Sequence, residues 1–575
     1  MKTAKMKTMK TKTILLASAA ALPLVPAVAQ QADKDSTLNR TVVVENQYHP
    51  EVMDAFKVNV LPKVEEPQVA KTHIDYATSL RPLGVWQGAA MPPITGSQEQ
   101  PDAPRGYVRA AYGNRNNTDF RLGYLWNPSE RDRLGVTGSF YGRSGHTPGF
   151  FEGEEWNSRF FRGDVSLDYR HDFSRVSLSL GGDGGVQNFN YMPARLDNGS
   201  FSQRFMSGQG YVGIASRQGQ CPIDFDFQTG IQLFGIQHDL GEWVPSSETK
   251  VHTVGWVAAD LAEDQRVGIG FALDNLFYSE KEGEKSDAWK RELKNYSLLQ
   301  LNPYYTYVNG GLKARLGAHV DMQMGNDGGL KVAPDVALDY TFSTSYTLYV
   351  HAGGGTTLND YRRLNELSPY HNGSLQPVVT YSPLDVEAGL KASPATGWDF
   401  RLFGGYKILK DDVFLTGTDV WVGEWSEATP LWQTCLYEQG ETKAAFGGAE
   451  LNGSYKGWFD LSLRGVYYDW QKKDDTAGSL WLKPQFTLDA SLRARILPDL
   501  HAGIRYQYEQ RALPYKDAPD REDPVSNLCL NADYQLFQRL NVFVQLNNLL
   551  DKDYVTAQGY PTQGFHALAG VSCRF

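Results

Sequence analysis

The residue types that carry most enzyme chemistry are few in this sequence and stand apart from one another. It has 11 histidines and 4 cysteines in 575 residues. None stands at the spacing of a helical metal-ligand pair, and neither HExxH nor GxSxG occurs. The nearest candidate is His319 with Asp321, which would share one face of a strand, as any polar pair lining a wet channel would. We therefore expect no catalytic residue and no cofactor, and we predict that the protein is not an enzyme.

Acidic residues gather in two stretches, 279–287 and 516–523. Their oxygens suit calcium or the cations that bridge lipopolysaccharide, but solvated loops have the same composition, and no EF-hand pattern occurs. The sequence thus leaves any metal ligand unknown. The formal net charge of −10 argues against a nucleic-acid partner.

A different chemistry, strand addition to a partner, is available near the N-terminus. Thr41, Val42, Val43, Val44 and Glu45 form a β-branched run. An extended segment of this kind can add a strand to another protein through its main chain. An ordinary linker, or a segment that binds another envelope component or the barrel wall, would look the same.

The chain begins with an export signal. Five lysines precede an apolar run from Ile14 to Val25, and Ala27-Val28-Ala29 follows. The run is too short to span a bilayer, so we predict a signal peptide over 1–29 that is cleaved after Ala29. Residues 30–104 are rich in proline, which predicts an irregular periplasmic or lumenal segment without a core of its own.

From Gly106 onward the apolar period is two. The last strand shows it most clearly, because alternate residues on one face are apolar: Phe565, Ala567, Ala569, Val571, Cys573 and Phe575. A soluble sandwich or propeller also has alternating strands, but these strands reach ten or more residues, against five or six in most soluble sheets. Long strands with one apolar face are typical of transmembrane barrels. We predict that these six residues of the last strand face lipid and that the strand is recognised during membrane insertion.

The connections between these strands alternate between short and long. The short connections include 127–132, 171–173, 309–311 and 393–397, and the long ones include 143–159, 184–202, 280–293, 357–374, 411–440, 471–479, 511–524 and 551–564. Outer-membrane barrels have short periplasmic turns and longer outer loops. The sequence thus predicts an all-β fold, a transmembrane antiparallel β-barrel of about 22 strands over 105–575, although 20 or 24 strands would keep the same parity.

This topology places the cysteines in unlike surroundings. Cys221 falls in a turn, Cys435 in a loop, Cys529 on the lumenal face and Cys573 on the lipid face. We therefore expect no disulfide. Aromatic residues of the long loops are either platforms for a carbohydrate or partner, or packing between loops: Phe150, Phe151, Trp156, Trp421, Trp425 and Trp432.

The C-terminal stretch resembles the end of TonB-dependent outer-membrane receptors. The matching elements are Asn548-Leu549-Leu550-Asp551, Asp553-Tyr554, Gly559-Tyr560-Pro561, Gly564 and the closing strand. The resemblance implies a 22-stranded barrel in the outer membrane of a Gram-negative bacterium, with lipid and the outer-membrane assembly machinery as partners. Thr41–Glu45 resembles a TonB box, which would imply a TonB-like periplasmic partner. The chain departs from the family in that 30–104 is too short for the plug domain of these receptors.

Two functions are compatible with these features. One is a plug-depleted relative of the receptors that binds or transports a ligand. The other is a barrel scaffold in an outer-membrane complex, with a surface lipoprotein or another envelope protein as its partner.

Overall fold

In the computed structural model, the structure describes residues 104–148, 155–192, 201–217, 219–238, 246–280, 293–326, 328–371, 378–422, 429–472, 480, 483–512, 523–557 and 560–575. All of them belong to one compact unit. The predicted signal peptide, the segment 30–103 and Thr41–Glu45 lie outside the described residues.

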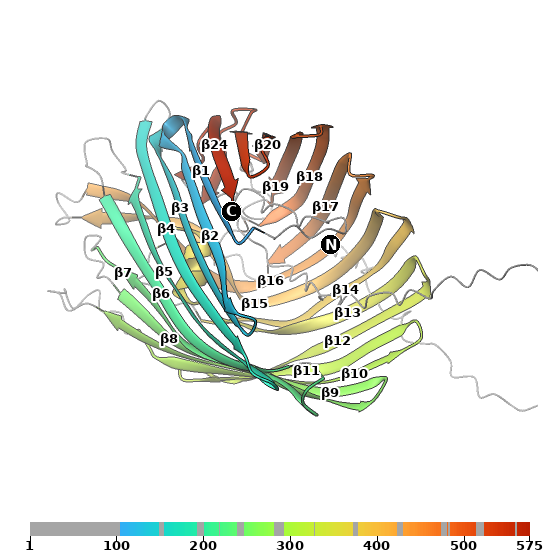
Figure 1. The fold of residues 1–575 in the computed structure, drawn as a ribbon. Coiled ribbons are helices and arrows are strands. Elements are labelled where there is room, and N and C mark those ends of the chain that lie inside the picture. The colour runs from blue at the N-terminus through green and yellow to red at the C-terminus, as the bar shows by residue number, and fades with distance from the viewer. Residues whose placement is uncertain are drawn as a thin grey trace, which may run out of the picture. The chain divides into compact units, whose positions relative to one another are not determined.

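The described chain forms a closed antiparallel barrel of 22 strands, which confirms the predicted fold class. Each strand pairs with its neighbours in the sequence, and the first and last strands of the sheet, β1 and β24, close the ring. Their register runs from Tyr107 opposite Arg574 to Gly113 opposite Leu568. Figure 1 shows the two ends of the sheet, blue and red, lying side by side. Closure satisfies the backbone N–H and C=O groups that an open edge would leave unpaired in lipid.

The strands of the first half are β1 (Gly106–Gly113), β2 (Thr118–Ser129), β3 (Asp132–Pro148), β4 (Glu155–Asp172), β5 (Val176–Tyr191), β6 (Phe201–Ser216), β7 (Asp224–Ile236), β8 (Ser246–Ala262), β9 (Gln265–Glu280), β10 (Tyr296–Asn309) and β11 (Leu312–Met324). The strands of the second half are β12 (Leu330–Ser343), β13 (Tyr346–Thr357), β14 (Thr380–Ala395), β15 (Trp398–Val422), β16 (Thr429–Tyr455), β17 (Phe459–Lys472), β18 (Pro484–Leu497), β19 (Leu500–Arg511), β20 (Val525–Phe537), β21 (Leu540–Asn547) and β24 (His566–Arg574). Smaller elements are the 3-10 turn η1 (Asn114–Asn116), the helix α1 (Tyr361–Leu367) and the two-stranded sheet of β22 (Val555–Ala557) and β23 (Tyr560–Pro561).

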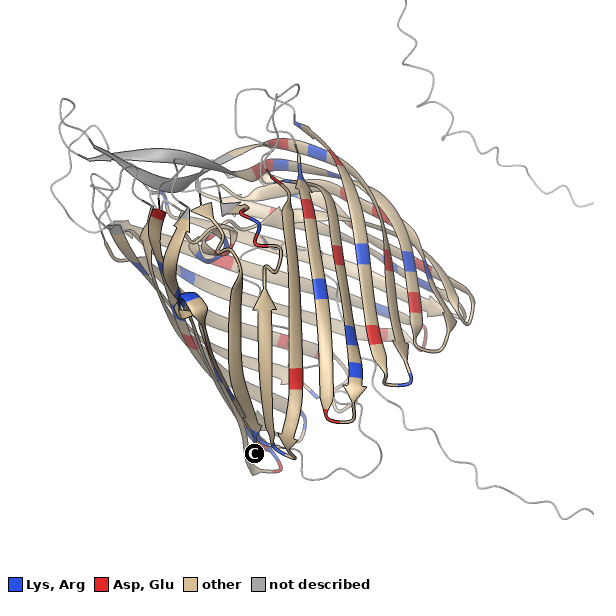
Figure 2. Cartoon of the chain, turned by 90° about the horizontal axis from the view of Figure 1, so that it is seen from above, with Lys and Arg blue, Asp and Glu red and all other residues tan. Residues whose placement is uncertain are grey.

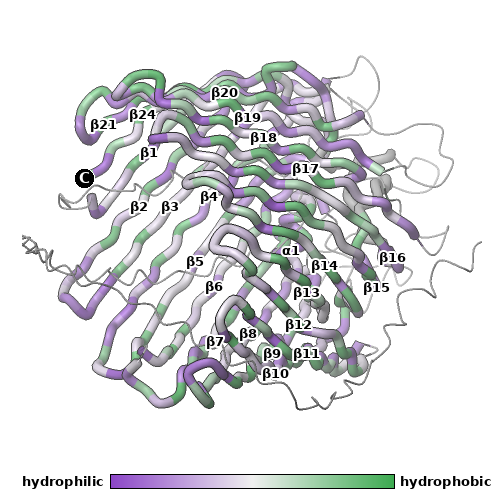
Figure 3. The backbone as a smooth tube through the Cα atoms, turned by 90° about the vertical axis from the view of Figure 1, so that its right-hand side faces the viewer, coloured by the Kyte–Doolittle hydropathy of each residue, from purple (hydrophilic) through white to green (hydrophobic). Residues whose placement is uncertain are grey.

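Side chains alternate between an apolar outer face and a polar inner face. On neighbouring strands β12 and β13, Leu338 and its partner Val350 are both exposed on the outside, whereas Tyr349 is buried on the inside. Figure 3 shows the resulting alternation of hydrophobic and hydrophilic positions along the strands. An exposed apolar band is what a barrel presents to lipid.

Short turns lie at one end of the barrel and long connections at the other. Gly310 and Gly397 occupy the two-residue turns β10–β11 and β14–β15 with φ of 55° and 82°. This left-handed conformation suits glycine, which has no Cβ to clash. We call the two ends the short-turn end and the long-loop end.

Several predicted loops are wrong because the strands continue into them. β15 and β16 remain paired through most of 411–440, so that Cys435 lies in a strand opposite Gly417 and not in a loop. β3 extends to Pro148, and β5 extends to Tyr191. The ladder hydrogen bonds need no apolar face, so a strand can continue where the alternation that marks it in the sequence has faded.

Candidate functional site at the long-loop end of the lumen

The connection between β13 and β14 folds into the barrel. We call residues 358–371 of this connection the inner segment. It contains α1, which begins after Asp360, whose side chain accepts a hydrogen bond from the backbone N–H of Arg363 at 2.9 Å. This is ordinary N-capping. Tyr361 and Leu364 are fully buried, so the helix owes its place to tertiary packing and not to its own length.

Polar contacts attach the inner segment to the lumenal face of β5. The Asn365 amide hydrogen-bonds to the Gln187 amide at 3.0 Å, and the Arg362 guanidinium lies 3.3 Å from Asp183. Val186, which precedes Gln187 in β5, is exposed on the opposite face of the strand. The alternation of β5 therefore places these contacts inside the barrel.

A second set of contacts joins the start of α1 to β8. The Glu248 carboxylate accepts the backbone N–H of Tyr361 at 3.2 Å, and Glu248 itself is only 2% exposed. The Lys250 ammonium lies 2.5 Å from Asp360. Such paired and hydrogen-bonded charges are the form in which buried ions are tolerated. The inner segment is thus fixed to two separate parts of the wall.

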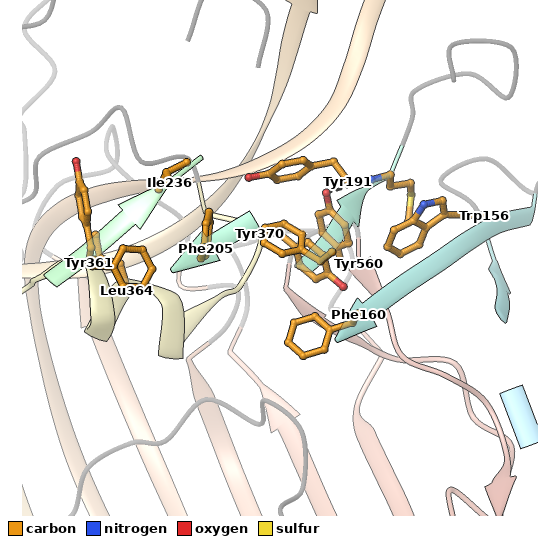
Figure 4. Packing of buried hydrophobic residues seen from close by; sticks show 12 residues of the cluster. Trp156, Phe160, Tyr191, Phe205, Ile236, Tyr361, Leu364, Tyr370 and Tyr560 are labelled. Atoms are coloured by element: carbon orange, nitrogen blue, oxygen red, sulfur yellow. Dashed lines mark hydrogen bonds between the residues drawn. The ribbon is translucent and has the colours of Figure 1, made fainter. Parts of the chain in front are cut away.

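An aromatic cluster completes this attachment. Phe189, Phe205 and Phe234 of β5, β6 and β7 pack against the inner segment. Figure 4 shows the cluster running from Tyr361 and Leu364 of α1 to Trp156 and Phe160 of β4. Its members are Trp156, Phe160, Phe189, Tyr191, Met192, Phe205, Phe234, Ile236, Tyr361, Leu364, Tyr370 and Tyr560.

Tyr560 brings the connection between β21 and β24 into the same cluster. Its ring stacks on Tyr370 with centroids 3.6 Å apart and planes 5° apart, and Trp156 lies edge-on to it at 5.6 Å. Val413 of β15 packs against the cluster from another part of the wall. The inner segment therefore connects strands β4–β8 with β15 and with the last long connection.

His371 ends the inner segment in an apolar setting. Its ring lies 5.1 Å from Phe205 and 6.3 Å from Tyr361, and its Nδ1 lies 3.1 Å from the Ser368 carbonyl, which accepts the hydrogen bond. Burial lowers the pKa of His371 to about 4, because the charged imidazolium would lose its water. The ring is therefore neutral at neutral pH.

Several charges on the lumenal wall pair with opposite charges within the wall. Arg315 lies 2.8 Å from Asp335, and Arg505 lies 2.6 Å from Asp489. Arg401 pairs with Glu387. Figure 2 shows acidic and basic residues interspersed over many strands. A wall of this kind can face water without a second domain to neutralise it.

The His319–Asp321 pair lies on this lumenal face as predicted, but it has a structural role. The Asp321 carboxylate accepts the backbone N–H of Thr356 at 2.6 Å and is almost fully buried. His319 contacts Asn302. Within the described ranges there is no group of three or more side chains that could hold a metal ion. The acidic stretch 516–523 lies almost wholly outside those ranges, as do residues 281–287 of the other.

The predicted C-terminal strand forms β24 and alternates. Ala569, Val571 and Phe575 are exposed, while Leu568 is buried on the other face against Phe543. Phe575 stacks on Tyr124 at 6.1 Å. Phe565, Ala567 and Cys573 are half-buried. The role of this strand in membrane insertion stays a prediction.

Sequence reasoning missed the inner segment, which it treated as part of a long loop. A local signal exists, because Asn359-Asp360 precedes Leu364 and Leu367 at helical spacing. Trp156 lies edge-on to both rings of the Tyr370–Tyr560 stack, which fits the packing alternative for the loop aromatics. Phe150 and Phe151, with the side chains of Trp421, Trp425 and Trp432, lie outside what the structure describes. Cys529 is buried on the lumenal face as predicted.

Solved outer-membrane transporters share this architecture. The siderophore receptor PirA from Acinetobacter baumannii matches with a TM-score of 0.64 and 11% identity, covering 83% of this chain and 81% of that one. The FrpB iron transporter from Neisseria meningitidis matches with a TM-score of 0.64 and 11% identity, covering 82% and 81%. The copper transporter OprC gives a TM-score of 0.60 and 13% identity, covering 82% and 80%. No protein-family model and no curated protein sequence matches the chain.

The fold is therefore that of the 22-stranded barrel of TonB-dependent receptors. At these identities the likeness defines the architecture and leaves the ligand open. Among the described helices, none is long and apolar enough to cross a membrane.

Proposed function

We propose that the protein is an integral outer-membrane barrel that binds a ligand and carries it through its lumen. The observation that carries this proposal is the polar lumenal wall, on which several charges pair with one another, as Arg315 does with Asp335 and Arg505 with Asp489. Such a wall tolerates water along its length without a plug domain to neutralise it. The exposed apolar outer face fits lipid, and the resemblance to TonB-dependent receptors supports the outer membrane as the location. The same resemblance argues against catalysis.

Energy coupling would use the N-terminal run Thr41–Glu45. We propose that it adds a strand to a TonB-like periplasmic protein. Val43→Pro should then abolish uptake and leave assembly of the barrel intact, because proline removes a donor from the added strand. Val43→Thr keeps the β-branched character and the donor, so it serves as the matched control.

A scaffold function is the second candidate, and the inner segment favours it. The segment is held at the long-loop end by hydrogen bonds to β5 and β8 and by the Tyr370–Tyr560 stack. Because the inner segment narrows the lumen, this barrel would conduct few ions, which suits a protein that presents its loops to a surface lipoprotein.

Uptake and co-purification separate the two functions, and planar-bilayer conductance tests whether the inner segment closes the lumen. The full-length protein is compared with a variant in which residues 359–371 are replaced by a short Gly/Ser linker. For the transporter, we expect low conductance that rises severalfold in the variant, together with loss of ligand uptake in cells that carry Val43→Pro. A scaffold would co-purify with a partner in fixed ratio, and Val43→Pro would release that partner with no uptake defect. Low conductance in both proteins, with no uptake defect in Val43→Pro cells, would contradict the transport proposal.

A further inference from the structure

Two opposite charges on the lumenal wall face each other across neighbouring strands without forming a pair. Asp385 of β14 and Lys407 of β15 are direct register partners. The adjacent Tyr406 is exposed on the outer face, so the alternation turns Lys407 and its partner Asp385 inward. Direct partners in an antiparallel sheet lie close enough to interact. Nearby, Arg401 does pair with Glu387.

Lys407 instead points along the wall toward aromatic rings. Its ammonium lies 4.8 Å from the centre of Trp470, 5.1 Å from Tyr468 and 6.0 Å from Phe446. These distances are those of cation–π contacts. Among the residues that the structure describes, Lys407 and Asp385 make no ion pair and no side-chain hydrogen bond. Both are only partly exposed, so each charge has lost some of its water while no counter-ion lies within ion-pair distance of it.

The other charges around them already have partners. Lys483 also lies over Trp470, at 5.1 Å, but its ammonium is 2.6 Å from Asp412. Trp470 is held in place by its Nε1–H, which donates to the Pro484 carbonyl at 2.7 Å. Lys407 and Asp385 are thus a separated positive and negative charge on a fixed aromatic wall.

This pair lies close to the inner segment. Val413, a few residues along β15 from Lys407 toward the long-loop end, packs against the aromatic cluster that holds the segment. A molecule that enters from the long-loop end must pass the segment before it reaches Lys407. The pair is therefore placed where a ligand in transit would meet it.

We propose that Lys407 and Asp385 form a lumenal binding site for a small zwitterion, a free amino acid or a short peptide with both ends charged. The ligand carboxylate pairs with the Lys407 ammonium, and the ligand ammonium pairs with the Asp385 carboxylate. Each wall charge then regains a hydrogen-bonded counter-ion. The inference rests on the proposed function, because it names the chemical class that the lumen would carry.

Calorimetric titration of the detergent-solubilised full-length protein with alanyl-alanine tests the site. We expect saturable binding that weakens at least tenfold in Lys407→Met and in Asp385→Asn. The blocked analogue N-acetyl-alanyl-alanine amide should not bind. Lys391→Met is the matched control, because Lys391 is a lysine of β14 whose ammonium lies 3.8 Å from Asp339; binding should change less than twofold. Heat-modifiability of each variant reports that the barrel has folded.

The charge-swapped double variant Asp385→Lys with Lys407→Asp gives the sharpest outcome. A zwitterion can bind in the reverse direction, so binding should return to within a fewfold of wild type. Equal binding of the blocked analogue, or no binding of alanyl-alanine to the folded wild-type protein, would overturn the site. Conductance and uptake do not depend on alanyl-alanine, so the proposed function can stand when this site fails.

Discussion

Acid should release the inner segment from the wall, and His371 provides the physical reason. Burial lowers the pKa of this imidazole from 6.5 to about 4. The docked segment therefore binds fewer protons than the released segment. The contribution of His371 to docking is complete above about pH 6.5 and is lost as the pH falls toward about 4, because protonation of this ring favours the released state.

The size of the effect follows from the two pKa values of His371. The full difference corresponds to about 3 kcal/mol, since one pKa unit is worth about 1.4 kcal/mol. At about pH 5 the released state is mostly protonated and the docked state is not, so docking has lost about 2 kcal/mol. His371 alone should then make the equilibrium constant for release about 30-fold larger than at about pH 7.5, an effect seen without interference from Glu248 in the Glu248→Gln protein.

Hydrogen exchange of the amides of Tyr361–Leu367, followed by mass spectrometry and corrected for the intrinsic effect of pH, measures this constant. His371→Phe keeps an aromatic ring beside Phe205 and should remove the dependence. Glu248 is also buried against the segment, so the titration is repeated in Glu248→Gln, where the histidine effect should persist. Equal corrected protection at both pH values in Glu248→Gln would refute the reasoning, as would an unchanged slope in His371→Phe.

Three further predictions concern packing and charge. Tyr560→Ala removes the ring that stacks on Tyr370 and should raise hydrogen exchange of the inner-segment amides at least tenfold. The reason is that an aromatic pair contributes about 0.5–1.5 kcal/mol beyond the area that it buries. Exchange in Tyr560→Phe should stay near that of the wild-type protein. Deleting Phe575 should lower the amount of heat-modifiable protein in the outer membrane, and unchanged assembly would count against a role of β24 in insertion. Arg401→Met leaves Glu387 half-buried without its cation and should cost about 1–3 kcal/mol in urea unfolding. Arg162→Met, from a pair in which both side chains are more than a third exposed, should cost under about 1 kcal/mol.

The barrel was predictable because the alternation of apolar and polar residues is a local property of each strand's sequence. A strand between lipid and a wet lumen must alternate, so each strand carries its own signature, as Phe565–Phe575 does. Counting strands by this alternation gave about 22, and the parity of short and long connections indicated an even number, as the closure of β1 on β24 requires. In the outer part of β15 the strand continues although the alternation in the sequence has faded, so the prediction stopped too early.

The inner segment was not predictable by the same means, because its determinants are distant in the sequence. Glu248 receives the N–H of Tyr361 from 113 residues away, and Gln187 meets Asn365 across 178 residues. Only Asp360 and the spacing of Leu364 and Leu367 mark the helix locally. The sequence of 357–374 does not indicate that this connection turns into the lumen, because the turn depends on contacts with residues of β5 and β8.

The lumenal wall and the inner segment together explain how a barrel of this size can work with so short an N-terminal segment. A plug that carried the complementary charges would leave unpaired ions on the wall when removed. Here Arg315, Arg505 and Arg401 already have their counter-ions within the wall. The inner segment narrows the lumen from the long-loop end through contacts that bury little charge beyond Glu248, Lys250 and Asp360. Its release therefore costs mainly aromatic packing, which a ligand that competes for the Tyr370–Tyr560 stack, or a proton on His371, could offset.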